Sequence, residues 1–164
     1  MLFPFIQKIN KKITVNHLLA IFWSSFWLLN GFDKFFNGEY FFGVTRDEKF
    51  IAYFSSIGMQ ADIALSLLYS CGVCEILIGV AFLWSFKNIT HRKEILEFCL
   101  KAGMSVFIIF SVFDILFGDR TELWEHSTFL ILLIVSYAFL QIMSKLQTMN
   151  TEHVLPHQNI PSKS

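Results

Sequence analysis

Among the ionisable side chains within the long apolar stretches of this chain, three could carry out proton chemistry. Glu75 is in the middle of the stretch from Ala61 to Phe86, and Asp114 and His126 lie near the ends of two later stretches. About 20 apolar residues cross a bilayer as a helix, so Glu75 should lie near the midplane. A lipid-facing carboxylate there costs roughly 2.5 to 3.5 kcal/mol, so we expect Glu75 to face the protein interior.

Asp114 and His126 are expected near the mouth of a polar funnel that ends at Glu75. A desolvated carboxylate and a histidine both exchange protons near neutral pH, so these three residues form a candidate catalytic site. It would serve a proton relay or bind a quinone headgroup. Alternatively, Glu75 only links helices and the other two residues meet the membrane interface.

Two further polar groups are weaker candidates. Asn30, Asp33 and Lys34 close the first apolar stretch and could contact a cofactor. Cys71 and Cys74 would share a helix face as a redox dithiol, but a thiolate is disfavoured in the bilayer interior, which favours ordinary packing. The sequence predicts no metal site, because these thiols, Glu75 and a distant histidine lack closely spaced ligand pairs.

Four helical spans must position these side chains. The pattern predicts an all-α, four-helix transmembrane bundle, with a short interfacial amphipathic helix between spans one and two because Phe50, Phe54 and Ile57 recur at helical spacing. The predicted segments are a cytoplasmic basic leader (1–16), a membrane domain (17–143) with spans at about 17–36, 61–86, 95–118 and 123–143, and a disordered cytoplasmic tail (144–164).

The composition excludes several classes of protein. Of the 164 residues 54% are hydrophobic and 16% charged, whereas charged residues make up about 25% of soluble domains. The formal net charge is zero, so no basic surface suggests nucleic acid. Three cysteines, all in apolar stretches, exclude a secreted disulfide framework. The expected surroundings are a lipid bilayer and other membrane proteins, and a homo-oligomer stays open.

The distribution of basic residues predicts the orientation. Nine Lys and Arg residues fall on the side of the two termini and four on the other side. The positive-inside rule therefore places both termini of this multi-pass membrane protein in the cytoplasm.

Two short motifs resemble those of the DoxX-like family of small four-span bacterial membrane proteins. The ending of span one, Asn30 to Phe35, is similar to the family's glycine-then-lysine ending, and the segment Gly72 to Leu83 is similar to its glutamate-then-glycine second helix. The family includes or lies near subunits of thiosulfate:quinone oxidoreductases and methylamine-utilisation membrane proteins. The resemblance implies a subunit or accessory of a quinone- or sulfur-linked redox system, with quinone as the implied cofactor.

Two other functions stay open. One is a non-catalytic membrane scaffold or assembly protein, in which Glu75 and Asp114 only tie helices together. The other is a small-solute or proton-coupled transporter, which the lack of an inverted repeat or a broken helix pair disfavours.

Overall fold

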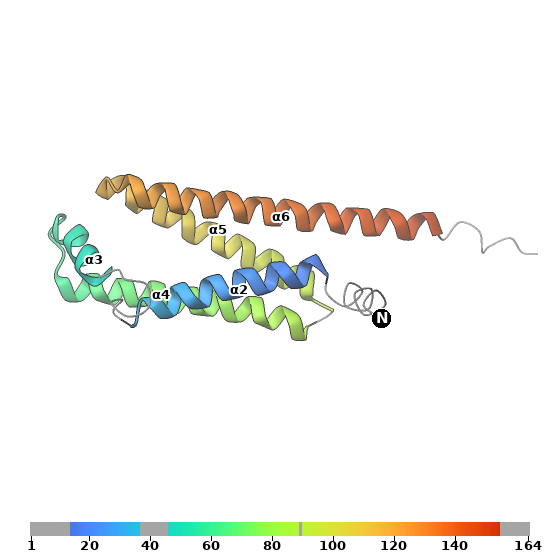
Figure 1. The fold of residues 1–164 in the computed structure, drawn as a ribbon, viewed down its shortest axis with the longest axis horizontal. Coiled ribbons are helices and arrows are strands. Elements are labelled where there is room, and N and C mark those ends of the chain that lie inside the picture. The colour runs from blue at the N-terminus through green and yellow to red at the C-terminus, as the bar shows by residue number, and fades with distance from the viewer. Residues whose placement is uncertain (1–13, 37–45, 89, 155–164) are drawn as a thin grey trace, which may run out of the picture.

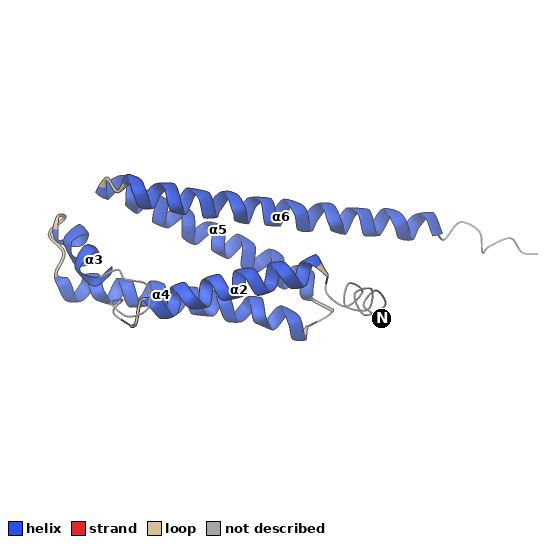
Figure 2. Ribbon diagram, in the orientation of Figure 1, coloured by secondary structure: helices blue, strands red, loops and turns tan. Residues whose placement is uncertain are grey.

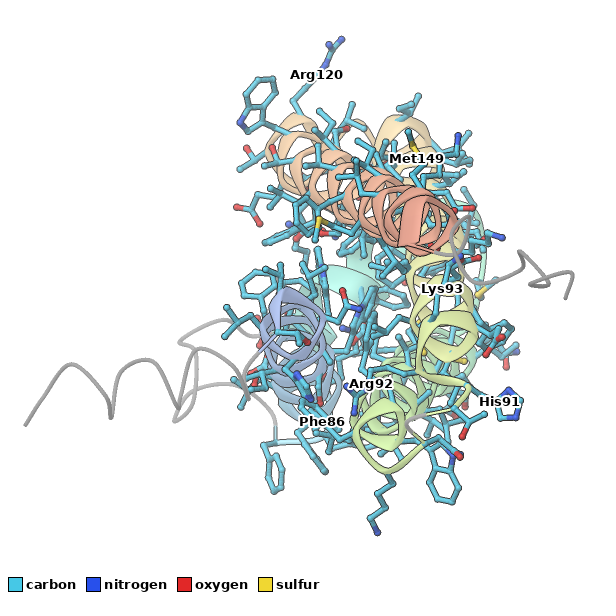
Figure 3. The ribbon with its side chains drawn as sticks, turned by 90° about the vertical axis from the view of Figure 1, so that its right-hand side faces the viewer. Phe86, His91, Arg92, Lys93, Arg120 and Met149 are labelled. Carbon is cyan, nitrogen blue, oxygen red and sulfur yellow. The ribbon has the colours of Figure 1, made fainter. Side chains whose placement is uncertain are left out.

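A computed structural model describes residues 14–36, 46–88 and 90–154, which form five helices and confirm the all-α prediction (Figures 1 and 2). Viewed end-on, α6 lies on one side of the molecule and α4 on the other (Figure 3). The helices are α2 (Val15–Asp33), α3 (Arg46–Ser55), α4 (Ala61–Lys87), α5 (Arg92–Phe117) and α6 (Arg120–Val154).

Three of these helices are long and apolar enough to cross a membrane: α4, α5 and the Arg120–Leu146 part of α6. At most 28% of any such segment is buried inside the protein, so most of its apolar side chains face outward. Leu116, Phe98 and Ile115 are each about two-thirds exposed. Surfaces of this kind require lipid, and the chain is a small multi-span membrane protein.

The predicted first span corresponds to α2, which does not meet the same criterion of length and hydropathy. Its 19 residues include polar side chains at both ends and in the middle: Asn16, His17, Ser24, Ser25, Asn30 and Asp33. These residues lower the hydropathy, although α2 contributes two fully buried tryptophans, Trp23 and Trp27, to the core.

The core joins two helix pairs, α2 with α4 and α5 with α6. The Trp23 indole donates a hydrogen bond to Ser136 of α6 (3.1 Å), and the Ser24 hydroxyl donates one to the Gly79 carbonyl of α4 (3.1 Å). Trp27 packs on Phe107 of α5, with ring centroids 5.1 Å apart. Thus α2 contacts all three of the longer helices, and the charged end of α2 is held inside the bundle.

Short connections fix the other helix ends. Gly118 ends α5 in the left-handed conformation (φ 75°), and the Asp119 carboxylate then accepts the backbone N–H groups of Thr121 and Glu122 at the start of α6. At the opposite end, the Arg92 guanidinium donates to the carbonyls of Ser85 and Phe86 as α4 gives way to α5 (Figure 3).

Two predicted segments differ from the structure. The short helix α3 is present, but Ile57 lies beyond its end and is 63% exposed, so the buried face of α3 is made by Phe54. Helix α6 continues to Val154 and replaces the irregular chain expected from Ser144, because Pro156 is the first residue of that segment that cannot continue a helix. Most of the predicted basic leader, and the last ten residues, lie outside the described residues.

Candidate functional site with two polar pairs between helices

The centre of the candidate site is an ion pair between helices α2 and α4. The Lys34 ammonium nitrogen lies 2.6 Å from Glu75 Oε2, and the two residues are only 7% and 2% exposed. Glu75 occupies the middle of α4, whereas Lys34 is the residue at which α2 ends. Because both charges are buried together, each offsets the desolvation of the other.

Glycines bring the two helices close enough for this pair to form. A Cβ atom added at Gly31 would lie 2.8 Å from the Gly72 carbonyl oxygen, and one at Gly72 would lie 3.2 Å from Lys34 Cβ. The two backbones therefore touch one turn before Lys34 and one turn before Glu75. Lys34 can reach Glu75 because no side chain of either glycine stands between the helices.

A second pair joins α5 to α6. His126 Nδ1 lies 2.6 Å from Asp114 Oδ2, and Asp114 is only 5% exposed. The ring of Phe110 is the neighbour that both pairs share: its centroid lies 6.0 Å from the Lys34 ammonium and 5.2 Å from the His126 ring. Phe110 thus lies between the two pairs, next to Lys34 of one and His126 of the other.

A third charged group lies where α3 meets the α5–α6 connection, at the end of the membrane-length part of α6. The Lys49 ammonium is 2.6 Å from Asp119 and also bonds Glu122, and the Tyr53 hydroxyl donates to Asp119. The hydrogen bonds from Lys49 and Tyr53 hold the pKa of Asp119 well below its ordinary value. Burial alone would lower the pKa of Lys49, but its hydrogen bonds to Asp119 and Glu122 outweigh burial and raise it.

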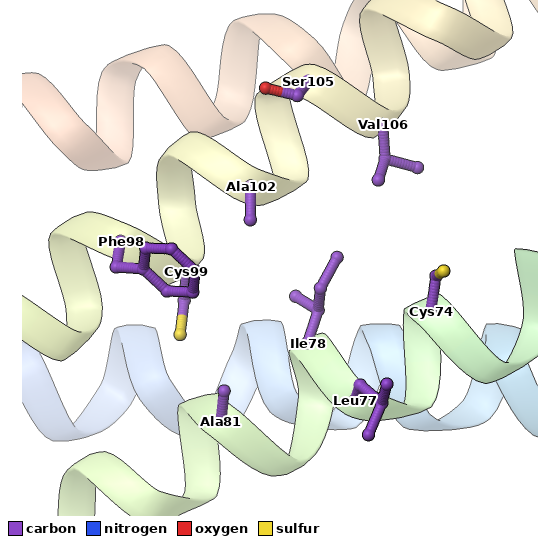
Figure 4. Close-up of a pocket in the computed structure, with 9 residues that line it drawn as sticks. All are labelled: Cys74, Leu77, Ile78, Ala81, Phe98, Cys99, Ala102, Ser105 and Val106. Atoms are coloured by element: carbon purple, nitrogen blue, oxygen red, sulfur yellow. The ribbon is translucent and has the colours of Figure 1, made fainter.

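Asn30 borders the site, because its backbone carbonyl accepts a hydrogen bond from the Lys34 ammonium (3.5 Å). The Asn30 amide bonds the Phe26 carbonyl of its own helix (2.9 Å), and Asp33 is buried. Cys71 and Cys74 are free thiols, and Cys74 faces a groove of about 400 Å³ between α4 and α5 (Figure 4). The groove is almost wholly apolar, and Glu75 is not among its lining residues.

No family model, curated protein or solved structure matches this chain. The geometry therefore carries the functional argument.

Sequence reasoning missed the pairing partner of Glu75 and the roles of Lys49 and Glu122. The sequence groups Lys34 only with its neighbours Asn30 and Asp33, since nothing in one sequence joins residues 41 positions apart. Glu122 and His126 are four residues apart in the sequence and so share a helix face, which indicates that Glu122 lies near the candidate site.

Proposed function

We propose that this chain is a small integral membrane subunit or accessory of a redox system that handles quinone or sulfur compounds. The observation that carries the proposal is the Lys34–Glu75 pair, buried at the middle of a membrane-length helix. Intramembrane charges are costly and rare, and they mark proton or substrate pathways. The similarity of its motifs to the DoxX-like family favours the same class of function.

The chemistry suits the residues. Reducing a quinone to its quinol takes two electrons and two protons, and the protons must reach the carbonyl oxygens of the headgroup. A redox partner subunit would supply the electrons. Lys34, Glu75 and His126 would supply hydrogen bonds and protons, since each has a protonated form that can donate. Asp114 would hold His126 in one orientation, as carboxylates do for catalytic imidazoles.

The proposed topology has four spans, with α2 as the first and both termini in the cytoplasm of a bacterial inner membrane. The three contacts of α2 with α4, α5 and α6 support its place in the bundle. The excess of basic residues on the terminal side supports the orientation. In this arrangement α3 lies at the outer interface, where its charged and apolar sides suit the headgroup region.

A scaffold or assembly protein is the second candidate, because the Lys34–Glu75 bond itself ties α2 to α4. Removing one partner of a buried ion pair costs about 3 to 5 kcal/mol, since the other charge is left unpaired. A purely structural pair would accept reversed charges, whereas a proton-handling pair needs each group in its own place.

The test measures thiosulfate-dependent quinone reduction in membrane vesicles with and without this chain. We expect Glu75→Gln to lower the rate, measured per molecule of the chain, at least tenfold. We expect the reversed pair Lys34→Glu/Glu75→Lys to reach the wild-type abundance without regaining the wild-type rate. Glu125→Gln, an exposed position on α6, is the matched control. A rate unchanged by removal of the chain would overturn the redox proposal, and full recovery with the reversed pair would favour the scaffold.

A further inference from the structure

We propose that Asp114, Glu122 and His126 bind a divalent transition-metal ion at the outer end of α5 and α6. One ligand atom from each side chain can be chosen so that all three lie within 4.8 Å of one another. Asp114 lies on α5, whereas Glu122 and His126 lie on α6, and the turn at Gly118 and Asp119 brings these two helices together. The cluster is therefore a product of the fold.

The donor set selects the class of metal. One imidazole nitrogen and two carboxylate oxygens suit zinc and its neighbours, whereas magnesium and calcium prefer oxygen ligands alone. Three protein ligands leave a position for water, which is the arrangement of an open zinc site. Asp114 is buried and meets His126 at 2.6 Å, so these two side chains already lie side by side. A metal ion would replace the proton between them and move the two ligand atoms apart to about 3.3 Å, the spacing that tetrahedral bonds of about 2.0 Å impose.

The third ligand can move into position. Zinc–oxygen and zinc–nitrogen bonds of about 2.0 Å place tetrahedral ligand atoms closer together than the widest spacing here, so Glu122 must rotate toward the other two. Its side chain is 37% exposed, and its bond within the described part of the chain is to the Lys49 ammonium. Rotation therefore requires no change in the buried core.

Lys49 occupies this cluster as a competing cation. Its ammonium bonds Glu122 and Asp119 and is 37% exposed, so it can turn into solvent when a metal arrives. Asp119 then keeps its hydrogen bond from Tyr53. Metal binding thus exchanges one positive charge for two, and it loosens one of the bonds that hold α3 to the bundle.

The site does not rest on the proposed redox function, because it needs no partner subunit and no quinone. It shares Asp114 and His126 with that function, so a bound metal ion would take the place of the proton between them. Its test uses the purified full-length chain in detergent with any affinity tag removed. Zinc affinity is measured by competition with a chromogenic chelator, and cobalt is used as a probe because a tetrahedral cobalt site with nitrogen and oxygen ligands absorbs visible light. His153 and His157 are replaced by alanine in a second background, so that binding to these histidines is not counted.

We expect one zinc per chain in both backgrounds. Glu122→Gln should weaken binding at least about tenfold, since even a supporting residue of a metal site has that effect. Lys49→Met should tighten binding severalfold, because it removes the competing charge. Glu125→Gln, also exposed on α6, should change nothing.

Equal affinity in the wild-type chain and Glu122→Gln would overturn the site. Weaker zinc binding in Lys49→Met would overturn the proposal that Lys49 competes with the metal ion, because it would mean that Lys49 helps to hold the ligands in place. His126→Ala removes a ligand but also leaves Asp114 unpaired, so its stability is measured alongside its affinity.

Discussion

At the scale of single residues, the described part of the chain places two basic side chains directly against buried carboxylates. Lys34 with Glu75 and Asp114 with His126 each place a basic group within 2.6 Å of a carboxylate. The energetic reason is the large cost of desolvating one charge alone, which a partner at hydrogen-bond distance offsets. Each pair also joins two helices, so the residues that could handle protons also help to fix how the helices meet.

The Asp119 group predicts how α3 responds to pH. The pKa of Asp119 in the folded protein lies below its ordinary value of 3.8. The stabilising effect of Asp119 is therefore fully present above pH 3.8 and is lost as the pH falls through the lowered pKa. The pKa of Lys49 is raised, so its contribution is lost only as the pH rises above its ordinary value of 10.5. We expect α3 to stay attached between about pH 5 and 9. Limited proteolysis over that range checks this.

The control for that measurement is Asp119→Asn, which removes the negative charge at every pH. It should speed cleavage near α3 throughout the range. A wild-type cleavage rate that rises steeply between pH 5 and 7 would contradict the prediction.

At the scale of elements, the contact between α2 and α4 depends on small residues. Gly31, Gly72 and Gly79 lie on the buried faces of the two helices. A Cβ at Gly79 would meet Leu28 Cγ at 2.7 Å, closer than real Cβ atoms approach their neighbours. The same contact carries the Ser24–Gly79 hydrogen bond, so the spacing of the helices serves packing and polar contacts together.

Gly31→Ala should therefore destabilise the protein. Its new Cβ would lie 2.8 Å from the Gly72 carbonyl and 2.9 Å from the Ile76 nitrogen, and neither backbone atom can move without moving α4. We expect a loss of about 1 to 3 kcal/mol, as for other overpacked cores. Thermal unfolding in detergent measures it, with Ser25→Ala on the exposed side of α2 as the control. Equal midpoints for the two variants would contradict this account.

The positions of most helices can be predicted from the sequence, whereas most contacts within the candidate site cannot. Long apolar runs predict α4, α5 and α6 because a membrane-length helix needs little else. The end of α6 was missed because polar residues such as Lys145 and Gln147 favour a helix as readily as a disordered tail. The Lys34–Glu75 pair could not be predicted, because it depends on how closely α2 and α4 approach and on their register.

At the scale of the whole molecule, α2 decides the topology. If α2 crosses the membrane with α4, α5 and α6, the two termini lie on the same side, whereas three crossings place them on opposite sides. We expect a fluorescent reporter to fold in the cytoplasm at either terminus, and a reporter enzyme that works only outside the cytoplasm to be active when inserted after Gly118. Opposite results at the two termini would contradict the four-span proposal.

The two-residue connection between α5 and α6 has a consequence for biosynthesis. Because only Gly118 and Asp119 join the two helices, we expect α5 and α6 to enter the bilayer together as a hairpin. Before α6 leaves the ribosome, Asp114 has no imidazole beside it and α5 would expose a carboxylate to lipid. The arrival of His126, near the start of α6, removes that obstacle, so we expect the emergence of the first turns of α6 to commit both helices to the membrane.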